Sequence, residues 1–184
     1  MVTTTLRELV TASPAETEAA GEALGSRLSV GDVVLLVGEL GAGKTTFVRG
    51  VARGAGSTAP VASPTFQLVR VYPGRLQLAH IDLYRIEKAP ELAELGLDEL
   101  ADQGAVLIEW GDRLLSLTSP LPRYAGQYPA QPGDGEEQPL TSPLVGKYRP
   151  QAGDGEEHLP FAIIEIEHLG GDRRVLRTRR DLGH

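Results

Sequence analysis

The sequence contains no cysteine, so it can form neither a disulfide framework nor a zinc site with thiolate ligands. It also lacks an apolar run approaching the ~18 residues of a membrane-spanning helix, and residues 1–7 hold no apolar signal core. The net charge of -7 argues against a broad surface that binds nucleic acid by neutralising its phosphates. We therefore expect a soluble, cytoplasmic protein in which residues 1–184 form a single domain large enough to bury a core.

Glycine and proline are plentiful, with 22 and 13 residues, and they are unevenly placed. Residues 128–138 and 148–158 are imperfect copies of one stretch rich in proline, glycine and acidic residues. Two copies are too few for a solenoid, which needs at least ~3 repeats. The composition instead predicts a flexible insertion at about 118–158.

Residues 38–45 read G-E-L-G-A-G-K-T, which fits the phosphate-binding pattern G-x-x-x-x-G-K-[ST]. Its glycines let backbone N–H groups turn inward and wrap a polyphosphate without Cβ clashes. Lys44 can reach the outer phosphates, and the Thr45 hydroxyl can ligate Mg²⁺. The predicted nucleotide contacts in and after this loop are Gly38, Glu39, Leu40, Gly41, Ala42, Gly43, Lys44, Thr45 and Thr46.

The segments around the loop alternate between strand and helix patterns. Residues 33–37 form an unbroken apolar run typical of a strand buried on both faces, and residues 45–54 predict a helix that ends at glycine. Other expected elements are a strand at 3–10, a helix opened by the capping box Ser13-Pro14-Ala15-Glu16, a hairpin of 67–72 and 75–82, short helices from 90 and 97, a strand at 105–110, and a closing hairpin of 159–168 and 173–178. This order predicts an α/β fold: a three-layer, P-loop NTPase-like fold with a mixed, mostly parallel sheet.

ATP hydrolysis needs groups outside the loop that steady Mg²⁺, place the attacking water and sense the γ-phosphate. Glu109 and Asp82 each end an apolar strand, at the sheet edge where open α/β sheets bind ligands. Either could serve Mg²⁺ or the nucleophile, and either could instead cap a following helix. Thr65 could act as a switch residue or belong to a plain turn. We interpret His80 as a structural residue, and we expect Trp110, beside Glu109, to be a wall of the site.

Three further features lie outside these motifs. Thr17 projects from the first turn of the N-terminal helix, either solvated or near a nucleotide base. Arg113 is included among the predicted nucleotide contacts. Basic residues gather near the C-terminus, where we favour a solvated strand edge guarded by charge over a docking patch; they are Arg173, Arg174, Arg177, Arg179 and Arg180.

In this order, the motifs resemble the TsaE (YjeE) family, the small ATPases of bacterial tRNA threonylcarbamoyladenosine (t6A) biosynthesis. The resemblance runs from about Ser13 to Arg113 and resumes near Leu159. It rests on residues 38–46, 63–66 (S-P-T-F), 80–85 (H-I-D-L-Y-R), 94–97 (E-L-G-L) and 109–110 (E-W). Ile81 stands where the motif usually has phenylalanine, and the 118–158 segment has no counterpart.

The resemblance implies roles for individual residues. Thr45 and Glu109 would contact Mg²⁺, Asp82 would be an essential acid, and Thr65 a switch-like threonine. Trp110 would respond to nucleotide.

The resemblance also places Pro14 and Thr17 beside the base. It implies ATP or ADP and Mg²⁺ as ligands and slow ATP hydrolysis. It further implies docking on the partners TsaD and TsaB, with tRNA reached only through that complex.

Two alternatives remain open. A small P-loop kinase would use the same loop, with Arg113 or Arg123 in a lid. A nucleotide-binding switch would use the same residues without turnover.

Overall fold

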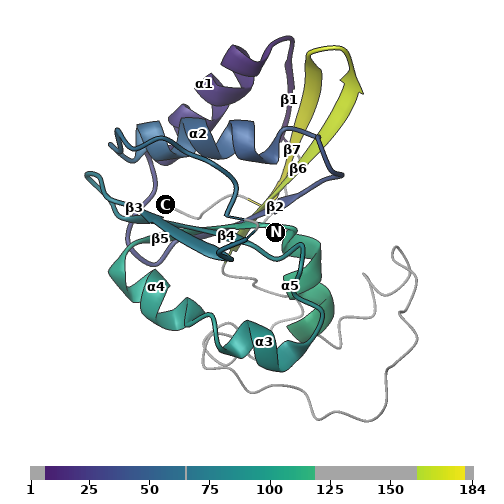
Figure 1. Cartoon of the computed structure of the whole chain (residues 1–184). Coiled ribbons are helices and arrows are strands. Elements are labelled where there is room, and N and C mark those ends of the chain that lie inside the picture. The colour runs from purple at the N-terminus through teal and green to yellow at the C-terminus, as the bar shows by residue number, and fades with distance from the viewer. Residues whose placement is uncertain (1–6, 65, 119–160, 181–184) are drawn as a thin grey trace, which may run out of the picture.

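The computed structural model describes residues 7–64, 66–118 and 161–180 (Figure 1). Thr65 therefore lies outside the described residues. The same holds for residues 119–158 of the predicted insertion, of which only Thr118 is described. The elements are β1 (Arg7–Thr11), α1 (Pro14–Gly25), β2 (Val33–Val37), α2 (Lys44–Gly54), β3 (Val69–Tyr72), β4 (Leu78–Asp82), α3 (Ala89–Ala93), α4 (Leu97–Gln103), β5 (Ala105–Glu109), α5 (Gly111–Thr118), β6 (Phe161–Gly170) and β7 (Arg173–Arg180). The expected strands and helices within the described residues all form, with small shifts at their ends.

The strands form one seven-stranded sheet in the order β1-β7-β6-β2-β5-β4-β3. Its central strands β6, β2, β5 and β4 are parallel to one another. Strands β7 and β3 are antiparallel to their neighbours, and β1 is antiparallel to β7, so β1 runs in the direction of the central strands. Five of the seven strands thus share one direction, which confirms the predicted mixed, mostly parallel sheet.

Helices cover both faces of the sheet, which confirms the three predicted layers. Figure 1 shows α1 and α2 on one side of the sheet and α3, α4 and α5 on the other. The apolar residues of β2 are buried on both faces of the sheet. Val34 and Leu36 belong to the core cluster under α2, whereas Val33 and Leu35 belong to the cluster on the opposite face. No helix among the described residues is long and apolar enough to cross a bilayer.

Helices α1 and α2 approach each other through glycines on both sides. A Cβ added to Gly50 would overlap the carbonyl of Glu18, and one added to Gly54 would overlap that of Glu22. These contacts advance in the same direction along both helices, so the N-terminus of α1 lies at the same end as the N-terminus of α2. Close backbone contact of this kind requires residues without a Cβ.

The start of α1 confirms the predicted cap, with one difference. The Ser13 hydroxyl accepts a hydrogen bond from the N–H of Glu16, as a capping box predicts. The Glu16 carboxylate, however, accepts from the N–H of Ala12 rather than from that of Ser13.

The C-terminal arginines do not lie on a sheet edge, so that interpretation is wrong. Strand β7 pairs with β6 on one side and with β1 on the other. The N-terminal strand supplies the extra partner, a pairing between chain ends that local sequence patterns cannot reveal. Arg177 instead forms ion pairs across the sheet with Glu8 on β1 and Glu167 on β6.

Candidate functional site

The glycine-rich loop joins the carboxyl end of β2 to the N-terminus of α2, as predicted. Gly43 is the N-cap of α2 with a φ of 110°, a conformation that favours glycine. No side chain of the described residues caps this helix, and its first turn contains no acid. The N–H groups and the positive end of the helix dipole therefore remain for an anion.

The beginning of the loop lies against β6. A Cβ on Gly38 would overlap the carbonyl of Ile166 on β6, so only glycine fits at this position. At the other end of the loop, a Cβ on Gly43 would lie 3.2 Å from Nε of Arg174 on β7. The β6–β7 hairpin thus borders the loop on the side away from β5.

Lys44 is almost fully buried, with 4% of its surface exposed. Its Nζ donates to the carbonyls of Gly38 and Glu39, at 2.7 and 2.9 Å, and lies 4.0 Å from the ring centroid of Trp110. Burial lowers the pKa of Lys44, while the carboxylates of Glu109, Asp112 and Asp82 act in the opposite direction. A buried cation held by loop carbonyls is suited to bind a phosphate that enters the loop.

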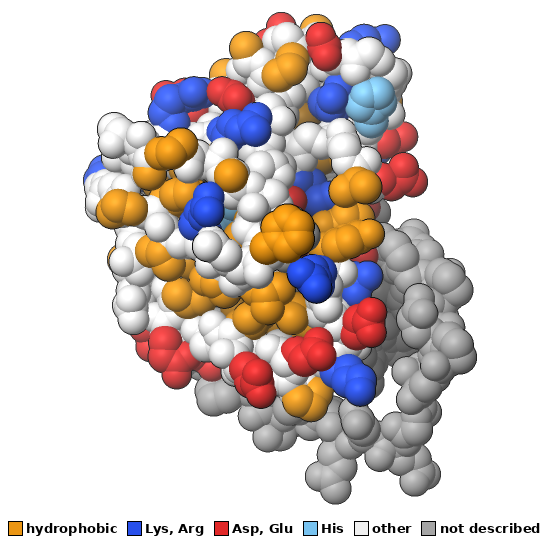
Figure 2. All heavy atoms as spheres, viewed as in Figure 1, with side chains coloured by type: hydrophobic (Ala, Val, Ile, Leu, Met, Phe, Trp, Pro, Cys, Tyr) orange, Lys and Arg blue, Asp and Glu red, His pale blue; other side chains and the backbone are white. Residues whose placement is uncertain are grey.

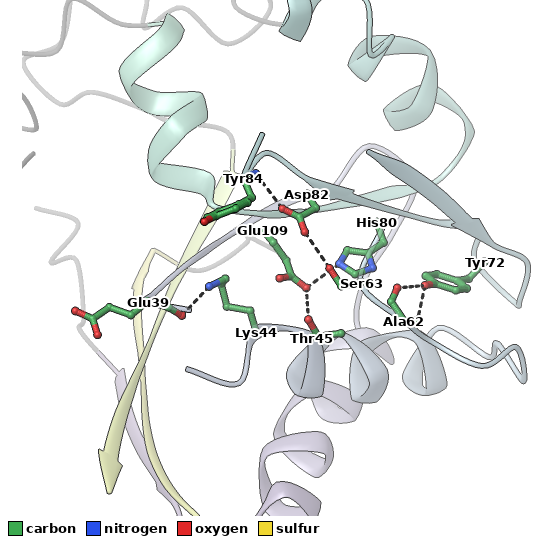
Figure 3. Close-up of polar contacts among 10 residues, drawn as sticks. All are labelled: Glu39, Lys44, Thr45, Ala62, Ser63, Tyr72, His80, Asp82, Tyr84 and Glu109. Carbon is green, nitrogen blue, oxygen red and sulfur yellow. Dashed lines mark hydrogen bonds and ion pairs between the residues drawn. The ribbon is translucent and has the colours of Figure 1, made fainter. Parts of the chain in front are cut away.

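Glu109 and Thr45 meet directly, although they are far apart in the sequence. The Thr45 hydroxyl donates to Oε1 of Glu109 at 2.8 Å, and His80 Nε2 lies 2.9 Å from the same oxygen (Figure 3). His80 and Glu109 are both buried. Alternation along β4 and β5 explains the meeting, because both side chains face the layer that contains α2.

Asp82 lies beside this pair at the end of β4, where it pairs in register with Glu109. Its carboxylate accepts from the Ser63 hydroxyl and from the N–H of Tyr84, each at 2.9 Å (Figure 3). Asp82 therefore stabilises the turn after β4, and it also connects the loop containing Ser63 to the sheet. The alternative of a helix cap does not hold, because α3 begins only at Ala89.

The hydroxyl and carboxylate oxygens of Thr45 and Glu109 are the hard ligands that Mg²⁺ prefers. Among the described residues, no group of three or more His, Asp or Glu side chains could hold a metal ion unaided.

Trp110 follows Glu109 with a φ of 61°, an uncommon conformation for a residue other than glycine. Its ring lies 5.1 Å from that of Tyr84, and it borders Lys44 as a wall of the loop. Arg113 donates to the carbonyl of Ile86 at 2.8 Å, so its guanidinium is held on the side of α3.

The segment predicted to lie beside the base is at the loop end of α1. Pro14 is exposed there, whereas Thr17 is buried. The Thr17 hydroxyl donates to the carbonyl of Ser13 and is hydrogen-bonded to the Thr11 hydroxyl, so its single hydrogen is used within the chain. The predicted nucleotide contacts all stay predictions, those of Pro14, Thr17 and Arg113 included.

Several residues of this region were not assigned to the site from the sequence, among them Ser63 and Tyr84 on the Asp82 carboxylate. His80 belongs to the Glu109 network, and Arg174 lies against Gly43. The alternation of residues 80 and 82 along one strand could have indicated that His80 and Asp82 share a face. No local signal could have identified Arg174, because its contact with the loop depends on the pairing of β7.

Comparison with known proteins identifies a common family. A family model described as "Threonylcarbamoyl adenosine biosynthesis protein TsaE" matches residues 11–130. A tRNA threonylcarbamoyladenosine biosynthesis protein TsaE from Treponema pallidum is 42% identical over 116 residues, covering 62% of this chain and 84% of the relative. The protein of the same name from Bacillus subtilis is 40% identical over 138 residues, covering 74% of this chain and 84% of the relative.

A solved structure agrees with this match. The crystal structure of YdiB from Bacillus subtilis superposes with a TM-score of 0.59 at 28% identity, covering 95% of this chain and 86% of that chain.

Proposed function

The chain belongs to the TsaE family, and on this basis we propose that it binds ATP with Mg²⁺, hydrolyses ATP slowly and thereby controls a TsaD–TsaB complex in t6A biosynthesis. One observation carries the proposal: an uncapped helix N-terminus, the buried Lys44 and the Thr45–Glu109 contact converge on one loop. These are the parts that phosphate and Mg²⁺ binding require.

Each group has a distinct role in this proposal. The loop N–H groups and Lys44 bind the phosphates, and Thr45 and Glu109 would hold Mg²⁺. When bound, Mg²⁺ neutralises charge that develops on the phosphates. Asp82 is held beside Glu109 by Ser63 and Tyr84, where its carboxylate can orient an attacking water and accept its proton.

Exposed apolar side chains near these residues support a partner protein. Leu40, in the loop, is 80% exposed, Phe66 is 89% exposed and Tyr84, beside Trp110, is 45% exposed. Figure 2 shows hydrophobic and basic side chains mixed across the middle of the face seen in Figure 1, above a row of acidic side chains. Exposed aromatic side chains of this kind are typical of protein interfaces.

The test is phosphate release from ATP by the purified full-length chain, with and without Mg²⁺. Lys44→Ala should weaken nucleotide binding, whereas Glu109→Gln should reduce hydrolysis more than binding. Glu99→Gln is the matched control, because Glu99 is exposed on α4 across the sheet. Equal loss of binding and hydrolysis in Glu109→Gln would contradict the role of Glu109.

Two further measurements separate the alternatives. If phosphate passes to a nucleoside or sugar faster than to water, the protein is a kinase. If neither water nor an acceptor is phosphorylated, even with TsaD and TsaB present, it is a nucleotide-binding switch. A pull-down with TsaD and TsaB in each nucleotide state tests the proposed partners directly.

A further inference from the structure

His80 is a fully buried polar side chain to which the proposed function gives no role. It lies in the middle of β4, between the buried residues Ala79 and Ile81, and its exposed fraction is 0%. An imidazole at such a position costs free energy unless it is hydrogen-bonded. Its contacts therefore need a specific explanation.

Only one of the two ring nitrogens of His80 has a hydrogen-bond partner among the described residues. Nε2 lies 2.9 Å from Oε1 of Glu109, whereas the buried Nδ1 has no partner among the described residues. The carboxylate oxygen accepts this hydrogen bond when Nε2 carries a proton, and in a neutral imidazole Nδ1 then holds the lone pair. The contact with Glu109 thus selects one tautomer of His80.

The imidazole is also supported from behind. The Tyr72 ring packs beside it with 6.2 Å between ring centroids. The Tyr72 hydroxyl donates to the carbonyl of Ala62 at 3.0 Å and accepts from its N–H at 3.3 Å, which fixes the tyrosine in place (Figure 3). His80 on β4 is therefore held between Tyr72 on β3 and Glu109 on β5.

Glu109 receives two donors on one oxygen. Thr45 approaches Oε1 from α2 and His80 approaches it from β4, and neither engages Oε2 (Figure 3). Because Oε1 takes the hydroxyl hydrogen of Thr45, the lone pairs of that hydroxyl are left for a cation. The orientation of Thr45 consequently depends on where Oε1 is held.

We propose that His80 is a positioning residue: its Nε2–H fixes Oε1 of Glu109, and through Glu109 it orients the Thr45 hydroxyl for Mg²⁺. This inference rests on the proposed function. Residues that orient a metal ligand through a hydrogen bond typically change metal affinity by about 10- to 100-fold when they are replaced.

The first test uses the full-length protein without nucleotide or metal. A long-range ¹H–¹⁵N spectrum reports which ring nitrogen of each histidine is protonated, and His80→Gln identifies the His80 signals among the four histidines. We expect a proton on Nε2. A His80 ring without a proton on Nε2 overturns the inference.

The second test compares His80→Gln with His80→Asn. The glutamine amide nitrogen can reach the position of Nε2, whereas the asparagine amide reaches only that of Nδ1. We expect His80→Gln to keep most of the gain in ATP affinity that Mg²⁺ produces, and His80→Asn to lose about 10-fold or more of it. ATP affinity without Mg²⁺ and the melting temperature are the controls for the fold.

The outcomes are distinct. Equal retention or equal loss of the Mg²⁺-dependent gain in both variants overturns the inference. If the wild-type protein itself shows no Mg²⁺-dependent gain, the proposed function fails, and the tautomer measurement still decides whether His80 holds Glu109. If neither variant folds, the His80 ring is assigned through its own backbone resonances in the wild-type protein, and its tautomer alone decides.

Discussion

Replacing Gly50 by alanine should destabilise the protein, although alanine is the better helix former. Gly50 lies in α2 where the backbone of α1 crosses it. An added Cβ would lie 2.7 Å from the carbonyl carbon of Glu18 and closer still to its oxygen, whereas ordinary contact begins at 3.4 Å. The atoms in contact are backbone atoms, which cannot rotate away, so the two helices must separate.

The magnitude follows from two opposing effects. In a helix, replacing glycine by alanine ordinarily stabilises by about 0.5–1 kcal/mol. Overpacking a closely packed core costs about 1–3 kcal/mol with the backbone shifts included, and occasionally more. Because the overlap at Gly50 is with backbone, we expect a net loss of about 2 kcal/mol or more, which corresponds to roughly 4–8 °C in Tm for a chain of this length.

The assay is equilibrium denaturation with thermal unfolding as a second measurement. Arg49→Ala is the matched control, because Arg49 is the exposed neighbour of Gly50 in α2 and its substitution should change stability by less than about 0.5 kcal/mol. A Gly50→Ala protein as stable as the wild type would refute the close approach of α1 and α2.

Three further predictions concern the site. Burial raises the pKa of Asp112 above the unfolded value of about 3.9, so the free energy of unfolding should fall as pH rises from about 4 through the higher folded pKa. Asp112→Asn should make the free energy of unfolding from denaturant curves less dependent on pH in this range, and an unchanged pH slope would contradict the shift. Tyr72→Phe should lower the free energy of unfolding by about 1–2 kcal/mol, because the N–H and the carbonyl of Ala62 both lose their hydrogen bond to the Tyr72 hydroxyl. An unchanged free energy would show that water replaces the hydroxyl. Because Lys44 Nζ lies 4.0 Å from the Trp110 ring, inorganic triphosphate alone should change Trp110 fluorescence, and an unchanged spectrum at saturation would contradict this contact.

Much of the site could be predicted from short stretches of sequence. The loop at 38–45 has its structure because glycine spacing and backbone conformation are local properties. The strand ends at Asp82 and Glu109 could be predicted because apolar runs locate strands, and parallel strands bring their carboxyl ends to one edge. Their register, which places these two residues side by side, follows from the pairing of β4 with β5.

The tertiary structure decided the rest. Arg174 lies against the loop because β6 pairs with β2 and β7 pairs with β6, and β7 is an interior strand because β1 pairs with its other side. His80 likewise reaches Glu109 because β4 pairs with β5, and Glu109 reaches Thr45 because α2 packs against the sheet. Sequence patterns show which face a residue takes and where an element ends, because these follow from local geometry. Contacts between elements depend on packing across the whole sheet, and only the folded chain determines them.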